Sequence, residues 1–133
     1  EYGASEISLG DTTGMTNPEQ VKDLLAYLKE SLPELRIAVH FHNSRGLGLA
    51  NAYAAYQAGI RIFDSSVGGL GGCPTAVGAM GNITTEDLVN MLEEMGVSTG
   101  IDHSALLKAA GLVQQTLNTE LASFTFKQGR PAW

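Results

Sequence analysis

The sequence predicts an α/β fold, in which a parallel sheet with helices forms the C-terminal part of a (β/α)8 barrel. Three segments rich in β-branched residues each precede a helical pattern. They recur roughly every 30 residues, as βα units do. A complete barrel has eight units and about 250 residues, and three strands alone would leave two open sheet edges. We therefore expect residues 1–133 to be a partial barrel domain of about three βα units plus C-terminal helices, with the N-terminal half of the barrel absent.

The first βα unit is predicted from a short strand and a well-marked helix start. Glu6–Leu9 is a strand candidate that runs into the turn-like pair Gly10–Asp11. A helix should begin at Asn17–Pro18, because Asn caps free N–H groups and Pro suits the first helical position. From Val21 onward, apolar residues recur at i, i+3, i+4 and i+7, which gives one buried face, and Ser31–Pro33 ends the helix.

The later elements follow the same logic. Arg36–His42 is nearly all apolar, as a buried parallel strand should be, and an Ala-rich helix follows from about Leu47 to Ala58. The third strand is expected at Ile60–Val67, and it runs into a glycine-rich loop, Gly68–Gly81. Two further helices are expected, one after the capping residues at Thr84 and one from about His103 to Leu117.

Charge and composition exclude several classes of protein. Eight basic residues against 14 acidic ones give a net charge of -6, which argues against a nucleic-acid partner. No apolar run approaches the roughly 18 residues of a membrane span, so no membrane partner is expected. The single cysteine cannot form an internal disulfide, which favours a reducing compartment, and we expect the protein to be cytoplasmic.

Two histidines, His40 and His42, form the first candidate site. Residues i and i+2 of a strand point to the same face, so both imidazoles face one way. They stand at the carboxyl end of the strand, where barrel enzymes keep their active sites. Two such histidines can ligate a divalent metal. The alternative is a pair of hydrogen-bonded histidines in the core or at its rim, because His-x-His is a short pattern.

The glycine-rich loop carries the only cysteine, Cys73, directly after four glycines within five residues. So many glycines are typical of a mobile flap over a site, or of backbone that approaches a ligand closely. In that setting the Cys73 thiol can donate or accept a proton. The alternative is an inert, partly buried thiol.

Four more polar residues are expected near the same mouth. Asn43 and Arg45 follow the second strand and offer groups for a polar substrate. Asn82 ends the glycine-rich loop and can offer its amide oxygen to the same metal as the histidines. Asp11 ends the first strand as a candidate carboxylate. Each also has an ordinary explanation as a turn or capping residue.

Three stretches of the chain resemble the 3-hydroxy-3-methylglutaryl-CoA lyase family, which belongs to the metal-dependent lyases and condensing enzymes with a TIM-barrel fold. They are VHFHNSRGLGLAN at Val39–Asn51, FDSSVGGLGGCPTAVGAMGN at Phe63–Asn82 and TTEDLVNMLEEMGVSTG at Thr84–Gly100. The His-x-His-Asn motif with a downstream Gly-Asn is shared across the wider group. The GLGGCP run is more specific to the lyase.

The resemblance implies a metal site and a reaction. His40, His42 and Asn82 would ligate a divalent metal, Mg²⁺ or Mn²⁺, with Zn²⁺ as an alternative. The substrate would be an acyl-CoA, hydroxymethylglutaryl-CoA, which is cleaved at a carbon–carbon bond into acetoacetate and acetyl-CoA. Cys73 would protonate the acetyl-CoA enolate, and Asp11 would lie near the substrate hydroxyl.

The resemblance further implies that Glu86 supports the site from the helix behind Asn82. Two other interpretations stay open. The His-x-His core is equally compatible with an aldolase or condensing enzyme that acts on 2-oxo acids. The 133 residues alone would form an inactive fragment, which self-associates through its open sheet edges or pairs with the missing half of the barrel.

Overall fold

The computed structural model describes residues 3–72 and 81–129, and its sheet is parallel, as predicted. Three strands lie in the order β1 (Glu6–Asp11), β2 (Arg36–Phe41) and β3 (Ile62–Asp64). In the register, Gly10 of β1 and Asp64 of β3 are both partners of His40 in β2. The carboxyl ends of the three strands therefore meet at one edge, where the polar candidates were expected.

The third strand is shorter than the predicted Ile60–Val67. After Asp64 the chain turns into a short 3-10 helix, η1 (Val67–Gly69), in which Gly68 and Gly69 have φ angles of 64° and 73°. Residues with left-handed φ cannot continue a strand, and glycine adopts this region without strain. These two glycines therefore turn the backbone directly after Val67, so the strand region cannot extend past that residue.

The helices begin at the capping residues that the sequence indicated. Asn17 accepts hydrogen bonds from the N–H groups of Glu19 and Gln20, both at 3.1 Å, and Thr84 accepts one from Asp87 at 3.2 Å. The tail, for which no structure was predicted, holds a short helix capped by Ser123. The helices are α1 (Pro18–Ser31), α2 (Gly48–Gln57), α3 (Thr85–Glu94), α4 (His103–Leu117) and α5 (Phe124–Gln128).

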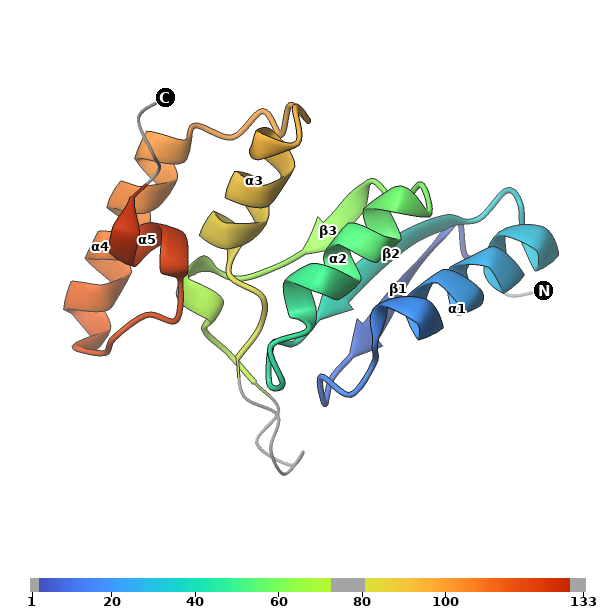
Figure 1. Ribbon diagram of the computed structural model, residues 1–133, viewed down its shortest axis with the longest axis horizontal. Coiled ribbons are helices and arrows are strands. Elements are labelled where there is room, and N and C mark those ends of the chain that lie inside the picture. Colours follow the sequence, from blue (N-terminus) through green and yellow to red (C-terminus); the bar gives the residue numbers. More distant parts are fainter. Residues whose placement is uncertain (1–2, 73–80, 130–133) are drawn as a thin grey trace.

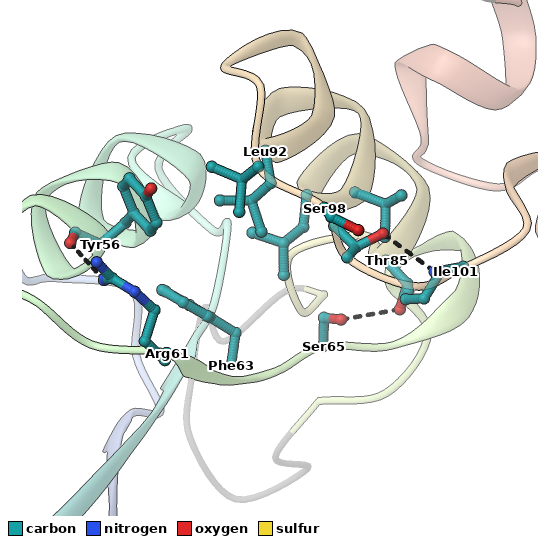
Figure 2. A pocket seen from close by; sticks show the side chains of 12 residues that line it. Tyr56, Arg61, Phe63, Ser65, Thr85, Leu92, Ser98 and Ile101 are labelled. Atoms are coloured by element: carbon teal, nitrogen blue, oxygen red, sulfur yellow. Dashed lines mark hydrogen bonds between the residues drawn. The ribbon is translucent and has the colours of Figure 1, made fainter.

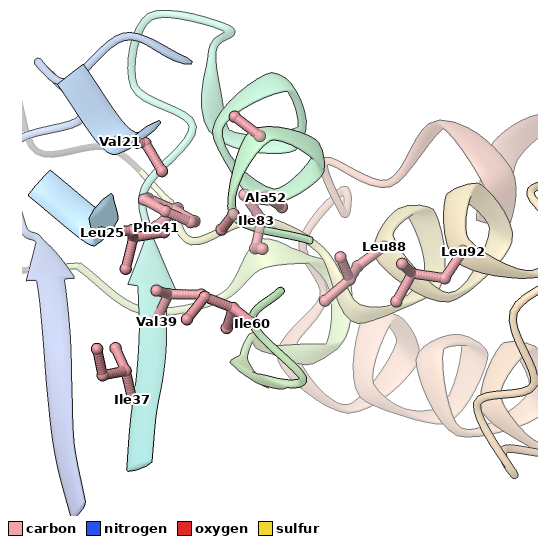
Figure 3. Close-up of a cluster of buried hydrophobic side chains, with 12 residues drawn as sticks. Val21, Leu25, Ile37, Val39, Phe41, Ala52, Ile60, Ile83, Leu88 and Leu92 are labelled. Carbon is pink, nitrogen blue, oxygen red and sulfur yellow. The ribbon is translucent and has the colours of Figure 1, made fainter. Parts of the chain in front are cut away.

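The main apolar core lies between one face of the sheet and helices α1 and α2. Ile37, Val39 and Phe41 alternate along β2 and are buried on this face (Figure 3). Leu25 of α1 and Ala52 of α2 pack against them, and the cluster continues through Ile83 to Leu88 and Leu92 of α3. Burial of each large side chain contributes about 1.5–3 kcal/mol, so this cluster is a principal source of stability.

The two ends of the chain form different arrangements (Figure 1). Helices α1 and α2 lie side by side over one face of the sheet, whereas α3, α4 and α5 gather beyond β3. On the opposite face of the sheet, Glu6, Ser8 and Asp64 are exposed. Within the two described stretches, no helix combines the length and apolar character that a bilayer crossing needs.

Candidate active site

The structure brings the three predicted metal ligands together at the carboxyl end of β2. His40 lies in the strand and His42 directly follows it, with ring centroids 5.0 Å apart and ring planes at 73°. His42 pairs with Asn82 across an isolated antiparallel bridge, although a helix and a strand separate them in the sequence. Backbone hydrogen bonds fix this contact, from Asn43 N–H to the Gly81 carbonyl and from Ile83 N–H to the Phe41 carbonyl, both at 3.0 Å.

The side chain of Asn82 is held on one side only. Its Nδ2 donates a hydrogen bond to the Leu70 carbonyl at 2.7 Å, while its Oδ1 is buried without a hydrogen-bond partner. A buried polar atom left unpaired costs about 1–3 kcal/mol, so such an atom calls for an explanation. Nδ1 of His42 is likewise buried without a partner. The two bridged residues thus carry one unpaired amide oxygen and one unpaired imidazole nitrogen, donor atoms that suit a cation.

The electrostatic environment keeps His42 neutral. Burial lowers the pKa of its imidazole, and the neighbouring His40 lowers it further, while the charge of Asp11 opposes both with a smaller effect. A neutral imidazole has a free lone pair on one ring nitrogen, the form in which histidine ligates metals. His42 is therefore in the protonation state that a ligand needs.

Asp64 is a site residue that sequence reasoning left undecided. Its Oδ2 lies 3.0 Å from Nδ1 of His40, at ion-pair distance but outside the direction of a hydrogen bond. The register pairs the two residues across β2 and β3. A usable signal was present, because an inward Phe63 in the core puts Asp64 on the other face, the face of the histidines. A carboxylate beside a metal-ligating histidine orients the ring.

Asp11 lies at the end of β1, as predicted, but its carboxylate is engaged in the following turn. Oδ1 accepts from Met15 N–H and Oδ2 from Thr16 N–H, each at 3.1 Å. Its register partner is Phe41, so it stands on the core side of the strand rather than on the His40 side. The structure thus brings Asp11 near enough for its charge to act on His42, but the carboxylate serves the loop.

Asn43 and Arg45 both lie in the loop between β2 and α2, at the mouth of the sheet. Asn43 accepts a hydrogen bond from Gly48 N–H at 3.0 Å, at the start of α2. Arg45 donates from Nη1 to the Thr13 carbonyl at 2.8 Å, which ties this loop to the one after β1. These contacts show the ordinary capping and turn roles, and a contact of either residue with substrate stays a prediction.

Glu86 supports the neighbourhood of Asn82 through the glycine segment. The carboxylate is fully buried, and both of its oxygens lie 3.0 Å from Gly68 N–H in η1. Burial raises the pKa of this carboxyl, and the backbone hydrogen bonds, including that from Gly68, oppose the shift. Glu86 thus holds the start of the glycine segment that contacts Asn82.

Sequence reasoning missed the next residue, Asp87. It accepts hydrogen bonds from Ser123 Oγ and Phe124 N–H at 3.0 Å, and from Thr125 N–H at 2.7 Å. Burial would raise the pKa of its carboxyl, but hydrogen bonds led by that from Thr125 outweigh burial, so the pKa is lowered. Helical periodicity gives no signal for this role, because an acidic residue in a first turn is ordinarily read as a favourable charge near the helix N-terminus.

Cys73, the predicted catalytic thiol, lies outside the described residues. Among residues 3–72 and 81–129, no three His, Cys, Asp or Glu side chains converge on one point. A metal at His40 and His42 would thus need the Asn82 oxygen and further ligands from water, substrate or residues outside these stretches.

A cavity of about 400 Å³ lies away from these residues, between α2, β3 and α3 (Figure 2). Its lining includes Tyr56, Phe63, Leu92 and Ile101, and none of the candidate site residues contributes to it. The guanidinium of Arg61 stacks 4.4 Å from the Tyr56 ring centroid and so already has a partner. The cavity is therefore separate from the candidate metal site.

The parallel sheet with its flanking helices defines a class, the α/β barrels, of which this chain forms a part, and comparison places the chain within that class. It belongs to the HMGL-like family, whose model matches residues 1–113. It is 47% identical over 97% of its length to the (R)-citramalyl-CoA lyase of Chloroflexus aurantiacus. It is 49% identical over 92% of its length to a hydroxymethylglutaryl-CoA lyase of Bacillus subtilis. The chain spans about two fifths of these relatives, 41% of each.

A solved structure supports the same assignment. The chain superposes with a TM-score of 0.92 on an HMG-CoA lyase from Acinetobacter baumannii solved in complex with coenzyme A and 3-methylmalate. The two share 50% sequence identity, and the match covers 98% of this chain and 43% of that one. The expectation of an α/β fold that forms part of a TIM barrel is thereby confirmed.

Proposed function

We propose that this chain carries the metal-binding part of a divalent-metal-dependent carbon–carbon lyase, which cleaves hydroxymethylglutaryl-CoA into acetyl-CoA and acetoacetate. The observation that carries the proposal is the convergence of His40, His42 and Asn82 at the carboxyl end of β2, with Asn82 Oδ1 and His42 Nδ1 buried and unpaired. The relatives named as lyases support the same reaction class.

The donor set supports a hard or borderline divalent cation. Two imidazole nitrogens and one amide oxygen suit Mg²⁺ or Mn²⁺, and the histidines also suit Zn²⁺. When bound, the metal supplies Lewis acidity that makes the substrate hydroxyl more acidic. His40, held against Asp64, and His42, kept neutral by burial, are the nitrogen donors in this proposal.

The remaining steps belong to protein side chains. A base near the substrate hydroxyl accepts the hydroxyl proton as the carbon–carbon bond breaks. Asp11 is the candidate, and its carboxylate must exchange a loop hydrogen bond, from Met15 or Thr16, for the substrate hydroxyl. The electron pair of that bond becomes the enolate of acetyl-CoA, and the other fragment leaves as acetoacetate. The Cys73 thiol then gives a proton to the enolate carbon, and the thiolate recovers a proton from the base, so that no proton is gained or lost.

Turnover by the full-length protein loaded with Mg²⁺ or Mn²⁺ tests the proposal. Cleavage of hydroxymethylglutaryl-CoA should fall by orders of magnitude in His42→Gln and Cys73→Ser. Lys22→Ala is the control, because the Lys22 side chain pairs with Glu19 on the solvent side of α1, and this variant should turn over substrate as the parent does. Unchanged turnover in Cys73→Ser would remove the thiol from the mechanism.

The substrate panel separates the alternatives. (R)-Citramalyl-CoA belongs in it, because a lyase named for that substrate matches 97% of the chain. A 2-oxo acid as the carbonyl acceptor, supplied with acetyl-CoA as the carbon nucleophile, tests the condensing-enzyme interpretation. Condensation of the 2-oxo acid, with no cleavage of hydroxymethylglutaryl-CoA or (R)-citramalyl-CoA, would overturn the lyase proposal.

Partners and location follow from the same proposal. The open edges of β1 and β3 support self-association of the 133-residue chain when it is produced alone, without lyase activity. A monodisperse monomer in light scattering would contradict the self-association. The single cysteine supports a reducing compartment, and we propose that the protein is cytoplasmic.

A further inference from the structure

We infer that Asp87 is a positioning residue for Asn82, and that it acts through residues 121–125, here called the C-terminal clasp. The inference rests on the proposed function, since it gives Asn82 the role of an oxygen ligand. Asp87 touches neither the histidines nor Asn82 in its hydrogen bonds. Its influence passes through two backbone segments, each of which is held by contacts described below.

The first link is the bond between α3 and the clasp. The carboxylate of Asp87 accepts from Ser123 Oγ, Phe124 N–H and Thr125 N–H within 3.0 Å, and Ser123 is fully buried. Hydrogen bonds to a charged acceptor are stronger than bonds between neutral groups. The C-terminal part of the clasp, residues 123–125, is therefore fixed to the first turn of α3.

The second link joins the clasp to Gly68 in η1. Ala122 N–H donates to the Gly68 carbonyl at 3.1 Å, and the buried Leu121 side chain packs over the same glycine. A Cβ at position 68 would lie 2.6 Å from Leu121 Cδ2, so the clasp approaches as closely as glycine permits. Since Glu86 accepts from Gly68 N–H on the other side, both backbone groups of this residue are held.

The third link leads from η1 to the ligand. The Gly69 carbonyl accepts from Asn82 N–H at 3.0 Å, and the Leu70 carbonyl accepts from Asn82 Nδ2 at 2.7 Å. With Nδ2 fixed in this way, the amide plane is set and Oδ1 is presented without a partner. The direction of the candidate ligand oxygen is thus determined by the position of the backbone directly after Gly68 and Gly69.

The coupling has a measurable size because ligand geometry is strict. A ligand must be held within about 0.5 Å to bind a metal well, and loss of a group that hydrogen-bonds directly to a ligand typically costs about 10–100-fold in metal affinity. For Asp87, which acts through intervening backbone, the lower end of this range applies. Asp87→Asn keeps the shape of the side chain but removes its charge and one acceptor oxygen. We expect it to weaken Mn²⁺ binding by roughly 10-fold.

The test measures Mn²⁺ affinity of the metal-free full-length protein by calorimetric titration, a readout independent of turnover. The matched control is Asp102→Asn, because Asp102 caps α4 through Ala105 N–H at 3.0 Å but has no bond to the clasp. The control should bind Mn²⁺ as the parent does. Where Asp87→Asn fails to fold, Ser123→Ala removes, of the bonds that Asp87 accepts, only the one from Ser123 Oγ and should weaken binding less, by about 2–5-fold.

A further variant separates this inference from the proposed function. Asn82→Leu removes the ligand oxygen and should weaken Mn²⁺ binding more than Asp87→Asn does. Unchanged affinity in Asn82→Leu would overturn the ligand role and with it the proposed metal site. This inference alone would be overturned if Mn²⁺ binding is weaker in Asn82→Leu but unchanged in Asp87→Asn. Faster amide exchange at Phe124 and Thr125 in Asp87→Asn would show that the clasp has loosened in that variant.

Discussion

Two regions of the chain are stabilised by different kinds of interaction. Residues 6–64, the strand region, are stabilised by an apolar cluster that spans β2, α1 and α2. Residues 66–72 and 81–128, the clasp region, join that cluster through Ile83, Leu88 and Leu92. They depend in addition on buried carboxylates, with Glu86 holding Gly68 and Asp87 holding the start of α5. The candidate site lies where these regions meet, because His40 comes from the first and Asn82 from the second. The geometry of the site therefore depends on both kinds of stabilisation.

The largest effect is expected from a cavity in the strand region. Leu25→Ala removes a side chain that is 1% exposed in the main core, and we expect it to lower the free energy of unfolding by about 2–5 kcal/mol. Chemical denaturation of the full-length protein measures the loss. Leu24→Ala is the control, because the Leu24 side chain is 48% exposed and its removal should cost about 0.5 kcal/mol. Equal losses in the two variants would contradict the strand-region core.

An intermediate effect is expected where the clasp meets η1. Gly68 and Gly96 both have positive φ, 64° and 78°, so alanine strains the backbone at either position. A Cβ on Gly96 meets nothing within 4 Å, whereas one on Gly68 collides with Leu121. Gly68→Ala should therefore destabilise by about 1–3 kcal/mol more than Gly96→Ala in the same denaturation experiment. Similar costs at both glycines would show that the clasp does not press on η1.

The smallest effect is a pair of opposite pH dependences in the clasp region. Because the folded pKa of Glu86 is raised, the native state holds its proton more tightly, and stability from this group falls as the pH rises from 4.5 towards the raised value. Because the folded pKa of Asp87 is lowered, its contribution is complete above 3.8 and is lost as the pH falls through the lowered value.

Unfolding of the metal-free protein at a series of pH values separates the two groups. Glu86→Gln should abolish the decline above pH 4.5, and Asp87→Asn should abolish the loss below pH 3.8. Profiles of these two variants that match the parent would contradict the opposite roles of the neighbouring carboxyls.

The contrast between the regions also explains what the sequence could predict. The nearly all-apolar run at Arg36–His42 and the caps at Asn17 and Thr84 are local signals, and they correctly indicated the parallel strand and the helices that begin at these caps. The predicted bounds of β3 were wrong, because the strand pairing covers only Ile62–Asp64, and the polar residues Asp64–Ser66 interrupt the apolar pattern before Val67. Helix α5 was missed, because its start depends on Asp87, which is remote in sequence.

The candidate site divides in the same way. The meeting of His42 with Asn82 followed from placing both at the mouth of the sheet, and the structure shows the bridge. The contact of Asp64 with His40 needed the register, which local patterns do not supply. The loop bonds of Asp11 show that an acidic residue at a strand end can serve the turn, a competing role that composition cannot decide.

Side chains alternate between the two faces of β2, so the core and the site depend on the same residue positions along this strand. Ile37, Val39 and Phe41 face the helices, and His40 and His42 occupy the intervening positions. Insertion or deletion of a single residue within the strand would exchange the two faces, driving an imidazole into hydrocarbon and an isoleucine or valine out towards the mouth. Insertions or deletions in β2 are thus tolerable only when they add or remove two residues, because two residues keep each side chain on its own face. The turns on either side of β2 have no such restriction. During divergence of the family, insertions should accumulate in those turns and avoid this strand.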